Sequence, residues 1–302
     1  MYETVSYTWR TTMWTPERLP DLTGSTAVVT GAGGGIGVPT ALELARHGAR
    51  VIMAVRDPAR ARPALEAVAA AAPGARAELR RLDLADLSSV RAFAAAVDEP
   101  VDLLINNAGV GMIPRRTTAD GFEMQFGTNH LGHFALTGLL LPRLLARPGA
   151  RVVTVSSDAH AFGRIDFGDL GLERRYGRFS AYGRSKLANL LFALELQRRA
   201  GARLLSVAVH PGATATGIAG RGPLVRAAMA AARLVLQPPE RGAIPSLYAA
   251  SSPGVRPGAF VGPGPKELRP RPGALDEAVA RRLWETSAEL TGVRFEMLER
   301  QP

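Results

Sequence analysis

The chain has 302 residues, 46% of them hydrophobic and 32 of them glycine, a composition typical of a globular protein and not of a disordered one. It contains no cysteine, which excludes disulfides, thiolate metal sites and cysteine nucleophiles. The formal net charge is +10, but all except two of the 37 basic residues are arginines spread over every predicted helix, so we expect no nucleic-acid partner.

The N-terminal residues 1–22 are expected to form an extension that precedes the fold. Their first twenty residues contain no apolar run of signal-peptide length. No segment of the chain reaches the run of about 18 apolar residues that a membrane-spanning helix needs. We therefore expect no membrane span and a cytoplasmic location.

From Ser25 onwards, short apolar runs alternate with longer stretches of helical periodicity. The runs are nearly continuous in apolar residues, as in parallel strands that are covered on both faces. Strands are predicted at residues 26–30, 49–55, 77–84, 101–106, 151–156, 203–209 and 258–261. This alternation predicts an α/β fold, a single-domain Rossmann-type doubly wound parallel sheet of about seven strands with helices on both faces.

After Pro211 the pattern weakens into a segment rich in glycine and proline, and a terminal helix follows from about Asp276. This part shows no core pattern of its own, so residues 23–302 are predicted to form one domain. Residues 213–237 are expected to be a movable flap over the functional site.

A glycine-rich loop follows the first predicted strand, which ends in Thr30, and leads directly into a helix. Glycine permits positive φ and a close approach of the backbone to a pyrophosphate, and the helix N-terminus offers free N–H groups. Its place in a βαβ unit favours a dinucleotide site over a merely flexible turn. The loop residues expected to bind the dinucleotide are Gly31, Gly33, Gly34, Gly35, Ile36 and Gly37.

The second predicted strand ends in Val55, followed by Arg56 and Asp57. An NAD-binding protein usually has an acid at this end for the ribose hydroxyls, whereas Arg56 is suited to pair with a 2′-phosphate. We therefore favour NADP(H) over NAD(H). Two alternatives stay open: Arg56 is only solvated while Asp57 caps the next helix, or Asp57 itself binds the ribose.

Further candidate residues follow the fourth and fifth predicted strands, at the edge where ligands bind in open α/β sheets. They are Asn106, Asn107, Ala108 and Gly109, and then Ser156 and Ser157. Farther on, Tyr182 and Lys186 are four residues apart, so a helix places them on one face. Because the chain has only two lysines, this ammonium beside a phenol indicates a role that arginine fills poorly.

These motifs, together with Pro211 and Gly212, resemble the short-chain dehydrogenase/reductase family, in particular its compact type and its retinol dehydrogenase-like branch. The resemblance covers residues 24–265. It implies that Tyr182 is the general acid and base and that Lys186, together with an oxidised nicotinamide, lowers the pKa of the phenol toward neutrality. It also implies that Ser157 aligns the substrate oxygen and that Asn129 helps to position a proton-relay water.

The same resemblance extends the cofactor site. Asp83 and Leu84 would lie at the adenine ring, although Asp83 is equally suited to cap a helix. Further cofactor contacts are implied for Asn107, Ala108, Gly109, Pro211, Gly212, Thr214 and Thr216, together with Tyr182 and Lys186. Helices near 118–147 and 180–200 look like the pair through which family members form a homodimer or homotetramer.

One departure from the family pattern is the pair Gly33 and Gly34, where relatives often carry a polar side chain that would brace the loop or touch a 2′-phosphate. This departure weakens the argument for NADP(H) but not the argument for a dinucleotide site.

We expect an NADP(H)-dependent oxidoreductase that interconverts a ketone or aldehyde and an alcohol on an apolar small molecule, since residues 213–237 are rich in apolar side chains. The histidines lack the spacing of metal ligands, and we predict no metal site. The alternatives are an NAD-dependent dehydrogenase of the same family, a noncatalytic dinucleotide-sensing protein on the same fold, and a related epimerase or dehydratase.

Overall fold

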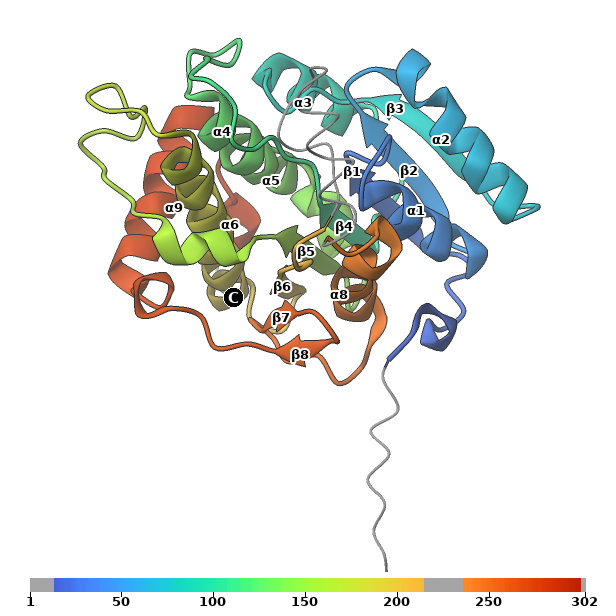
Figure 1. The fold of residues 1–302 in the computed structure, drawn as a ribbon. Helices are drawn as coiled ribbons and strands as arrows, with labels where there is room; N and C mark the ends of the chain where they lie inside the picture. The colour runs from blue at the N-terminus through green and yellow to red at the C-terminus, as the bar shows by residue number, and fades with distance from the viewer. Residues whose placement is uncertain (1–13, 215–235, 300–302) are drawn as a thin grey trace, which may run out of the picture.

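The computed structural model describes residues 14–214 and 236–299, and its centre is an eight-stranded sheet (Figure 1). The strands are β1 (Thr26–Thr30), β2 (Arg50–Val55), β3 (Ala77–Arg81), β4 (Leu103–Asn106), β5 (Arg151–Val155), β6 (Leu205–Val209), β7 (Phe260–Gly262) and β8 (Lys266–Glu267). They lie in the order β3-β2-β1-β4-β5-β6-β7-β8. All neighbours are parallel except β7 and β8. The predicted α/β class is confirmed, with one more strand than expected.

The additional strand, β8, has only two residues, and both are exposed and charged. It forms a short antiparallel hairpin with β7, in which Val261 lies opposite Glu267. No apolar run marks such a strand in the sequence. A short, charged strand is a common way to close the edge of a sheet against further pairing.

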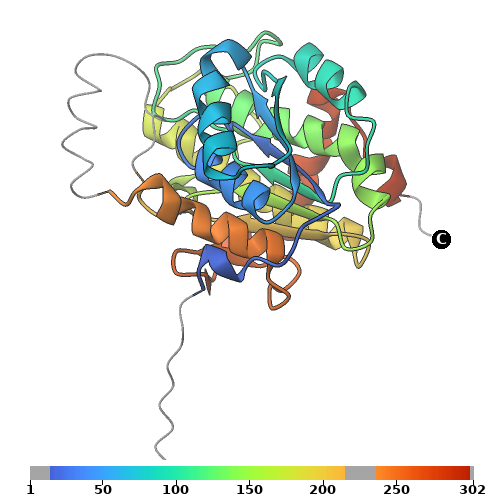
Figure 2. The same cartoon turned by 90° about the vertical axis from the view of Figure 1, so that its right-hand side faces the viewer.

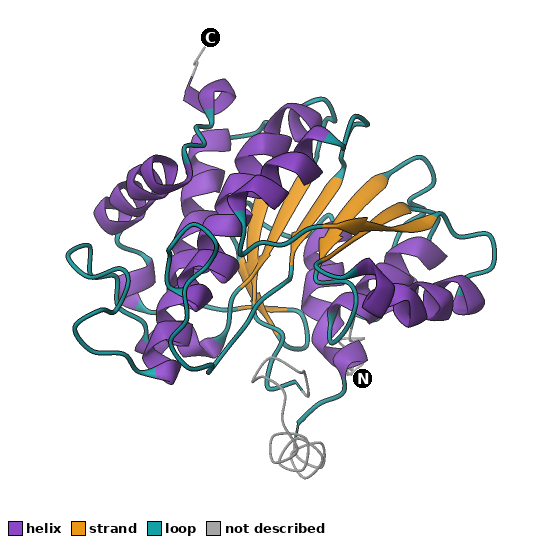
Figure 3. Ribbon diagram, turned by 90° about the horizontal axis from the view of Figure 1, so that it is seen from above, coloured by secondary structure: helices purple, strands orange, loops and turns teal. Residues whose placement is uncertain are grey.

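Helices cover both faces of the sheet (Figures 2 and 3). One face carries α1 (Gly37–Arg46), α2 (Pro58–Ala71) and α8 (Pro239–Ser251). The other face carries α3 (Leu87–Ala95), α5 (Gly132–Leu145) and α6 (Arg178–Ala200). The remaining elements are η1 (Pro16–Arg18), α4 (Met124–Phe126), the π-helical turn η2 (Gly127–Leu131), η3 (Asp158–Phe162), η5 (Pro272–Ala274), α9 (Glu277–Thr291) and α10 (Glu296–Glu299).

The core lies on both sides of the central strands. In β1, Val28 belongs to the apolar cluster on one face and Val29 to the cluster on the other, and both side chains are fully buried. This double burial is the reason that the strands are nearly continuous apolar runs in the sequence.

β1 lies between β2 and β4, so the order of the strands reverses on either side of it. The carboxyl ends of β1, β4, β5 and β6 share one edge of the sheet, since all these strands are parallel and in register. In open α/β sheets, ligands bind outside this edge at the point of reversal. The candidate residues at Thr30, Asn106 and Ser156 therefore meet there.

α9 packs against α5 and α6 (Figure 1). A cluster of aromatic rings lies in this contact. The ring of Trp284 lies 5.1 Å from that of Phe134, 5.8 Å from that of Phe192 and 4.4 Å from that of Phe295. The chain itself thus covers part of the two helices that we expected to pair between subunits. A homodimer or homotetramer stays a prediction.

Three further expectations concern the N-terminal extension, the flap and a membrane span. Leu19 and Leu22, at the end of the expected extension, are buried in the core, and the Trp14 ring lies 5.6 Å from that of Tyr248 in α8. Most of the expected flap, including Thr216, lies outside the described residues. Within residues 14–214 and 236–299, no helix is long and apolar enough to cross a membrane.

Candidate active site

The glycine loop after β1 forms a cradle that side chains would fill. Gly31 has φ +68°, and a Cβ atom there would lie 2.9 Å from the Cα of Ala108. A Cβ atom on Gly37 would lie 2.8 Å from the Cα of Ala32 and still closer to the carbonyl oxygen of Gly31. No side chain caps α1, whose N-cap is Ile36. This close backbone approach at the N-terminus of a helix fits a dinucleotide pyrophosphate.

The middle glycines of the loop differ from one another. A Cβ atom on Gly33 would lie 3.0 Å from the Cβ of Ala61 and 3.4 Å from the Cγ1 of Val55. Gly35 has φ +54°, which favours glycine. Gly34, in contrast, has open space on its Cβ side. The structure thus favours glycine at Gly35 and leaves room for a side chain at Gly34.

The residues after β4 lock this loop in place. The side-chain amide of Asn107 donates to the carbonyl oxygen of Thr30 at 2.7 Å. The backbone N–H groups of Asn107 and Ala108 donate to Oγ1 of Thr30, each at 2.9 Å. Asn106 is fully buried and donates to Thr137 at 3.1 Å. The Asn-Asn-Ala-Gly motif is therefore the support on which the glycine loop rests.

The end of β2 lies beside this loop, as the contact between Val55 and Gly33 shows. Asp57 is the N-cap of α2, where its carboxylate accepts from the backbone N–H of Arg60 at 3.1 Å. Arg56 is exposed and forms no hydrogen bond or ion pair with any described residue. Helix capping by Asp57 is therefore confirmed, and its binding of the ribose stays an alternative.

Asp83 and Leu84, expected at the adenine ring, follow β3. The carboxylate of Asp83 accepts from the backbone N–H of Ala85 at 3.0 Å, while Asp86 is the N-cap of α3. Leu84 is buried, and its carbonyl oxygen lies against Gly132 at the start of α5. Asp83 therefore stabilises a local turn instead of capping a helix, and its role toward adenine stays a proposal.

Tyr182 and Lys186 lie on α6, and the structure brings them to the carboxyl edge next to β5. The Lys186 Nζ lies 5.6 Å from the centre of the Tyr182 ring and donates to the carbonyl oxygen of Val155 at 3.0 Å. Tyr182 is 8% exposed and Lys186 2%. Ser157 follows β5, and its Oγ accepts from the backbone N–H of Ala159 at 3.2 Å. The three predicted residues are thus close together.

Burial dominates the electrostatics of Tyr182 and Lys186. Burial lowers the pKa of Lys186 to about 8. Burial also raises the pKa of Tyr182, and a hydrogen bond with the Ser157 side chain acts in the opposite direction. Among the described side chains, burial penalises the phenolate more than its neighbours stabilise it. The lowering of the phenol pKa by Lys186 together with an oxidised nicotinamide stays a prediction for the protein with its dinucleotide bound.

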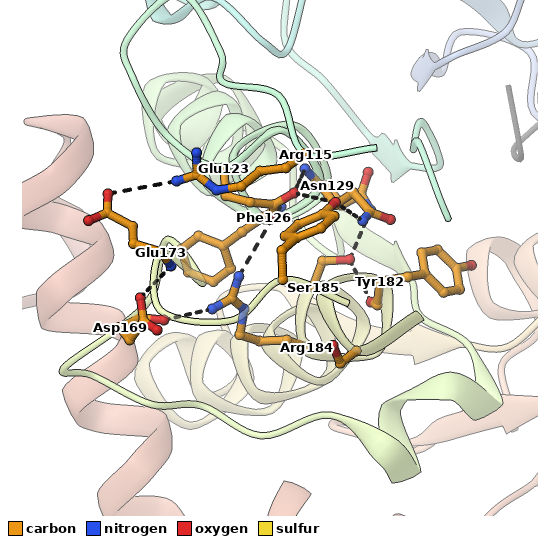
Figure 4. Close-up of polar contacts among 12 residues, drawn as sticks. Arg115, Glu123, Phe126, Asn129, Asp169, Glu173, Tyr182, Arg184 and Ser185 are labelled. Carbon is orange, nitrogen blue, oxygen red and sulfur yellow. Dashed lines mark hydrogen bonds and ion pairs between the residues drawn. The ribbon is translucent and has the colours of Figure 1, made fainter. Parts of the chain in front are cut away.

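Asn129 lies in the π-helical turn between α4 and α5. Its side chain accepts from the N–H of Val110 at 2.8 Å and donates to the carbonyl of Val110 at 2.8 Å. The second amide proton goes to Ser185, 2.9 Å away, which in turn donates to the carbonyl of Tyr182 (Figure 4). The side chain of Asn129 is therefore occupied in joining the loop after β4 to α6, and its expected role toward a water stays a proposal.

Pro211 and Gly212 follow β6, and Gly212 has φ +81°. Thr214 donates to the carbonyl oxygen of Gly212 at 3.2 Å. Gln237, which sequence reasoning missed, donates to the carbonyl of Pro211 and to Thr214 Oγ1 and forms a β-bridge with Thr214. Gln237 and Thr214 thus join the two ends of the segment between them, while Thr216 lies outside the described residues.

A buried arginine, Arg184, was also missed. Figure 4 shows its guanidinium pointing away from the Tyr182 side chain, toward Glu123 and the loop that carries Asp169. Arg184 donates to the carbonyl of Asp169 at 3.0 Å, lies 3.6 Å from the Glu123 carboxylate, and stands over the Phe126 ring at 5.4 Å. The signal available in the sequence was an arginine within an otherwise apolar helix face.

The described residues contain no group of three or more His, Asp or Glu side chains that could hold a metal ion. What the site offers is a buried phenol, an ammonium and a hydroxyl beside a glycine cradle. This set is suited to proton transfer next to a bound dinucleotide.

Comparisons with known proteins agree with this geometry. Residues 25–222 match the family model described as short chain dehydrogenase. Human retinol dehydrogenase 13 is 44% identical over 293 residues, which cover 92% of this chain and 88% of that protein.

Solved structures are similar as well. The crystal structure of an uncharacterized protein from Mycobacterium paratuberculosis is 46% identical and has a TM-score of 0.78, over 94% of this chain and 99% of that one. NADPH-bound carbonyl reductase from chicken fatty liver is 25% identical with a TM-score of 0.61, over 82% of this chain and 98% of that one. The chain therefore belongs to the short-chain dehydrogenase/reductase family of NAD(P)-dependent oxidoreductases.

Proposed function

We propose that this protein uses NADP(H) to interconvert an apolar aldehyde or ketone and the corresponding alcohol, with a retinoid-like molecule as the substrate class. The observation that carries the reaction is the buried pair of Tyr182 and Lys186, beside Ser157 and at the same sheet edge as the glycine cradle. The names of its relatives, retinol dehydrogenases at about 43% identity, support the substrate class.

In this proposal the dinucleotide supplies or accepts the hydride when it is bound. The hydroxyl of Tyr182 donates a proton to the carbonyl oxygen during reduction and takes it back during oxidation. Ser157 aligns the same oxygen by a hydrogen bond. Lys186 holds a positive charge beside the phenol, and its contact with the Val155 carbonyl fixes its position.

Two exposed aromatic side chains favour an apolar substrate. Phe162, in the turn that begins directly after Ser157, is 70% exposed, and Phe179, three residues before Tyr182, is 46% exposed. Their rings lie 5.5 Å apart. Exposed apolar surface beside a site is a common feature of ligand-binding surfaces.

The substrate class is tested with a panel of aldehydes and ketones of increasing hydrophobicity, by following oxidation of the reduced dinucleotide. Turnover is expected to rise with apolar chain length, and Tyr182→Phe should abolish turnover while the dinucleotide still binds. Full activity of this variant would refute the proton-transfer role of Tyr182. Dinucleotide binding by the wild type without any turnover would favour a noncatalytic sensor.

The preference for NADP(H) rests on Arg56, which is exposed directly after β2 and free to pair with a 2′-phosphate. Arg56→Ala should weaken NADPH binding by about tenfold or more and leave NADH binding unchanged, since a charge-assisted hydrogen bond contributes about 1.5–3 kcal/mol. Arg60→Ala is the matched control, because Arg60 is an exposed arginine nearby, in the first turn of α2. Equal binding of NADH and NADPH by the wild type would exclude this role of Arg56.

A further inference from the structure

His133, in the first turn of α5, uses both of its ring nitrogens although it is only 1% exposed. Its Nδ1 lies 2.9 Å from the main-chain carbonyl oxygen of Asn129. Its Nε2 lies 2.9 Å from the hydroxyl of Thr30, the residue immediately before the glycine cradle. The His133 side chain thus contacts both the residue before the glycine loop and the turn that carries Asn129.

Only one form of the His133 ring satisfies both contacts. A carbonyl oxygen can only accept, so Nδ1 must carry the proton that goes to Asn129. Nε2 then has a free lone pair for the hydroxyl proton of Thr30, whose oxygen already accepts two backbone N–H groups. This proton has a second acceptor in the carbonyl oxygen of Ile105 at 3.3 Å, but Nε2 is closer at 2.9 Å. A neutral ring agrees with the pKa of His133, which burial lowers to about 4.

The two contacts of His133 lead to different parts of the machinery. Thr30 receives the backbone N–H groups of Asn107 and Ala108 and so holds the floor of the dinucleotide cradle. Asn129 holds Val110 and, through Ser185, the main-chain carbonyl of Tyr182. The His133 imidazole therefore joins Thr30, beneath the glycine loop, to the turn that carries Asn129, in addition to the link that Asn129 itself makes between the loop after β4 and α6.

We propose that His133 is a positioning residue that fixes the π-helical turn of Asn129 against the floor of the dinucleotide site. Its Nε2 side acts on cofactor binding, and its Nδ1 side acts on proton transfer at Tyr182. The inference rests on the function proposed above.

The chain offers a matched control on the same turn. His130 is also 1% exposed, but its Nε2 contacts Ser287 of α9 at 2.9 Å and its Nδ1 has no hydrogen-bond partner among the described residues. His130 therefore points to the C-terminal helix and away from the cofactor floor. Replacement of His130 should change the stability of the protein but affect neither cofactor binding nor turnover.

Asparagine and glutamine separate the two contacts, because the amide of Asn reaches about the position of Nδ1 and the amide of Gln about that of Nε2. His133→Asn should keep the bond to Asn129, raise the dissociation constant of NADPH about tenfold and leave kcat within about twofold. His133→Gln should keep the bond to Thr30, leave NADPH binding within about twofold and lower kcat about tenfold. The same two changes at His130 should leave both quantities within about twofold.

NADPH binding by fluorescence titration and kcat at saturating cofactor and substrate are the two measurements, with the melting temperature of each variant beside them. Parallel loss of binding and turnover in both His133 variants, in proportion to lost stability, would mean that the ring is only structural. Wild-type values in both variants would overturn the proposal as well. A wild-type protein that binds no dinucleotide would overturn the proposed function and this inference together. If the wild type is active but His133→Asn and His133→Gln change NADPH binding and kcat in the same way, only this inference is overturned.

Discussion

Gly34 and Gly37, three residues apart in the cofactor loop, have opposite surroundings. Gly34→Ala should leave dinucleotide binding and stability nearly unchanged, because its Cβ meets open space. Gly37→Ala should weaken dinucleotide binding by tenfold or more, because its Cβ would press on Ala32 and on the carbonyl oxygen of Gly31. Isothermal titration of NADPH into both variants tests this. Equal affinities would show that the loop adapts and that the cradle is not rigid.

At the scale of single residues, the sequence was informative where chemistry depends on local spacing. The four-residue interval between Tyr182 and Lys186 fixed a common helix face, and the structure has them 5.6 Å apart from Nζ to ring. The contacts of Arg184 and His133 could not be predicted, because their partners are distant in sequence. Arg184 is 61 positions from Glu123, and His133 is 103 positions from Thr30. Such pairs become visible only once the topology is known.

At the scale of elements, Arg184 connects α6 with the segment 163–177 that separates Ser157 from Tyr182. The carboxylate of Glu123 also caps α4 and accepts from the hydroxyl of Tyr176, so three segments meet at one buried ion pair. Loss of either charge would leave the other buried without its partner, which is costly.

Arg184→Met is therefore expected to lower the free energy of unfolding by about 3 kcal/mol or more, as other broken buried pairs do. Arg175→Ala, an exposed arginine in the same segment, should change it by less than about 0.5 kcal/mol. Urea unfolding of the two variants beside the wild type measures both values. A small effect at Arg184 would mean that water reaches the Glu123 carboxylate.

The elements themselves were predictable to different degrees. Buried parallel strands such as β1 and β5 were recognised from their apolar runs, and their bounds agree within a residue. β8 has no such run. The π-helical turn 127–131 has no local sequence signal, and its side chains contact residues far along the chain, Ser185 of α6 and Ser287 of α9. The covering of α5 and α6 by α9 was likewise hidden, since its aromatic contacts join residues far apart in the chain.

At the scale of the whole molecule, two fully buried histidines make stability sensitive to acid. Burial lowers the pKa of His130 to about 3 and that of His133 to about 4, from 6.5. Below pH 6.5 these histidines bind protons in the unfolded chain but stay neutral in the folded one. Their contribution to the free energy of unfolding is therefore fully present above that pH and is lost as the pH falls toward 4. The loss should be about 3 kcal/mol per pH unit for the pair.

This dependence is measured as the free energy of unfolding in urea between about pH 6 and pH 5, below the unfolded-state pKa and above both folded-state values. In His130→Phe, which keeps an aromatic ring in place, the slope should fall by about 1.4 kcal/mol per pH unit. Carboxylates contribute to the slope in both proteins and cancel in the comparison. An unchanged slope would mean that His130 titrates in the folded state as it does in the unfolded one.

The scarcity of lysine has a practical consequence for the study of this site. The chain has two lysines, Lys186 beside the reactive phenol and Lys266 on the exposed edge strand β8. Growth on isotope-labelled lysine would thus yield a nuclear magnetic resonance spectrum with signals from only two ammonium groups. The signal of the exposed Lys266 would serve as an internal reference for that of Lys186. The titration of Lys186, whose pKa burial lowers to about 8, could then be followed atom by atom as ligands are added.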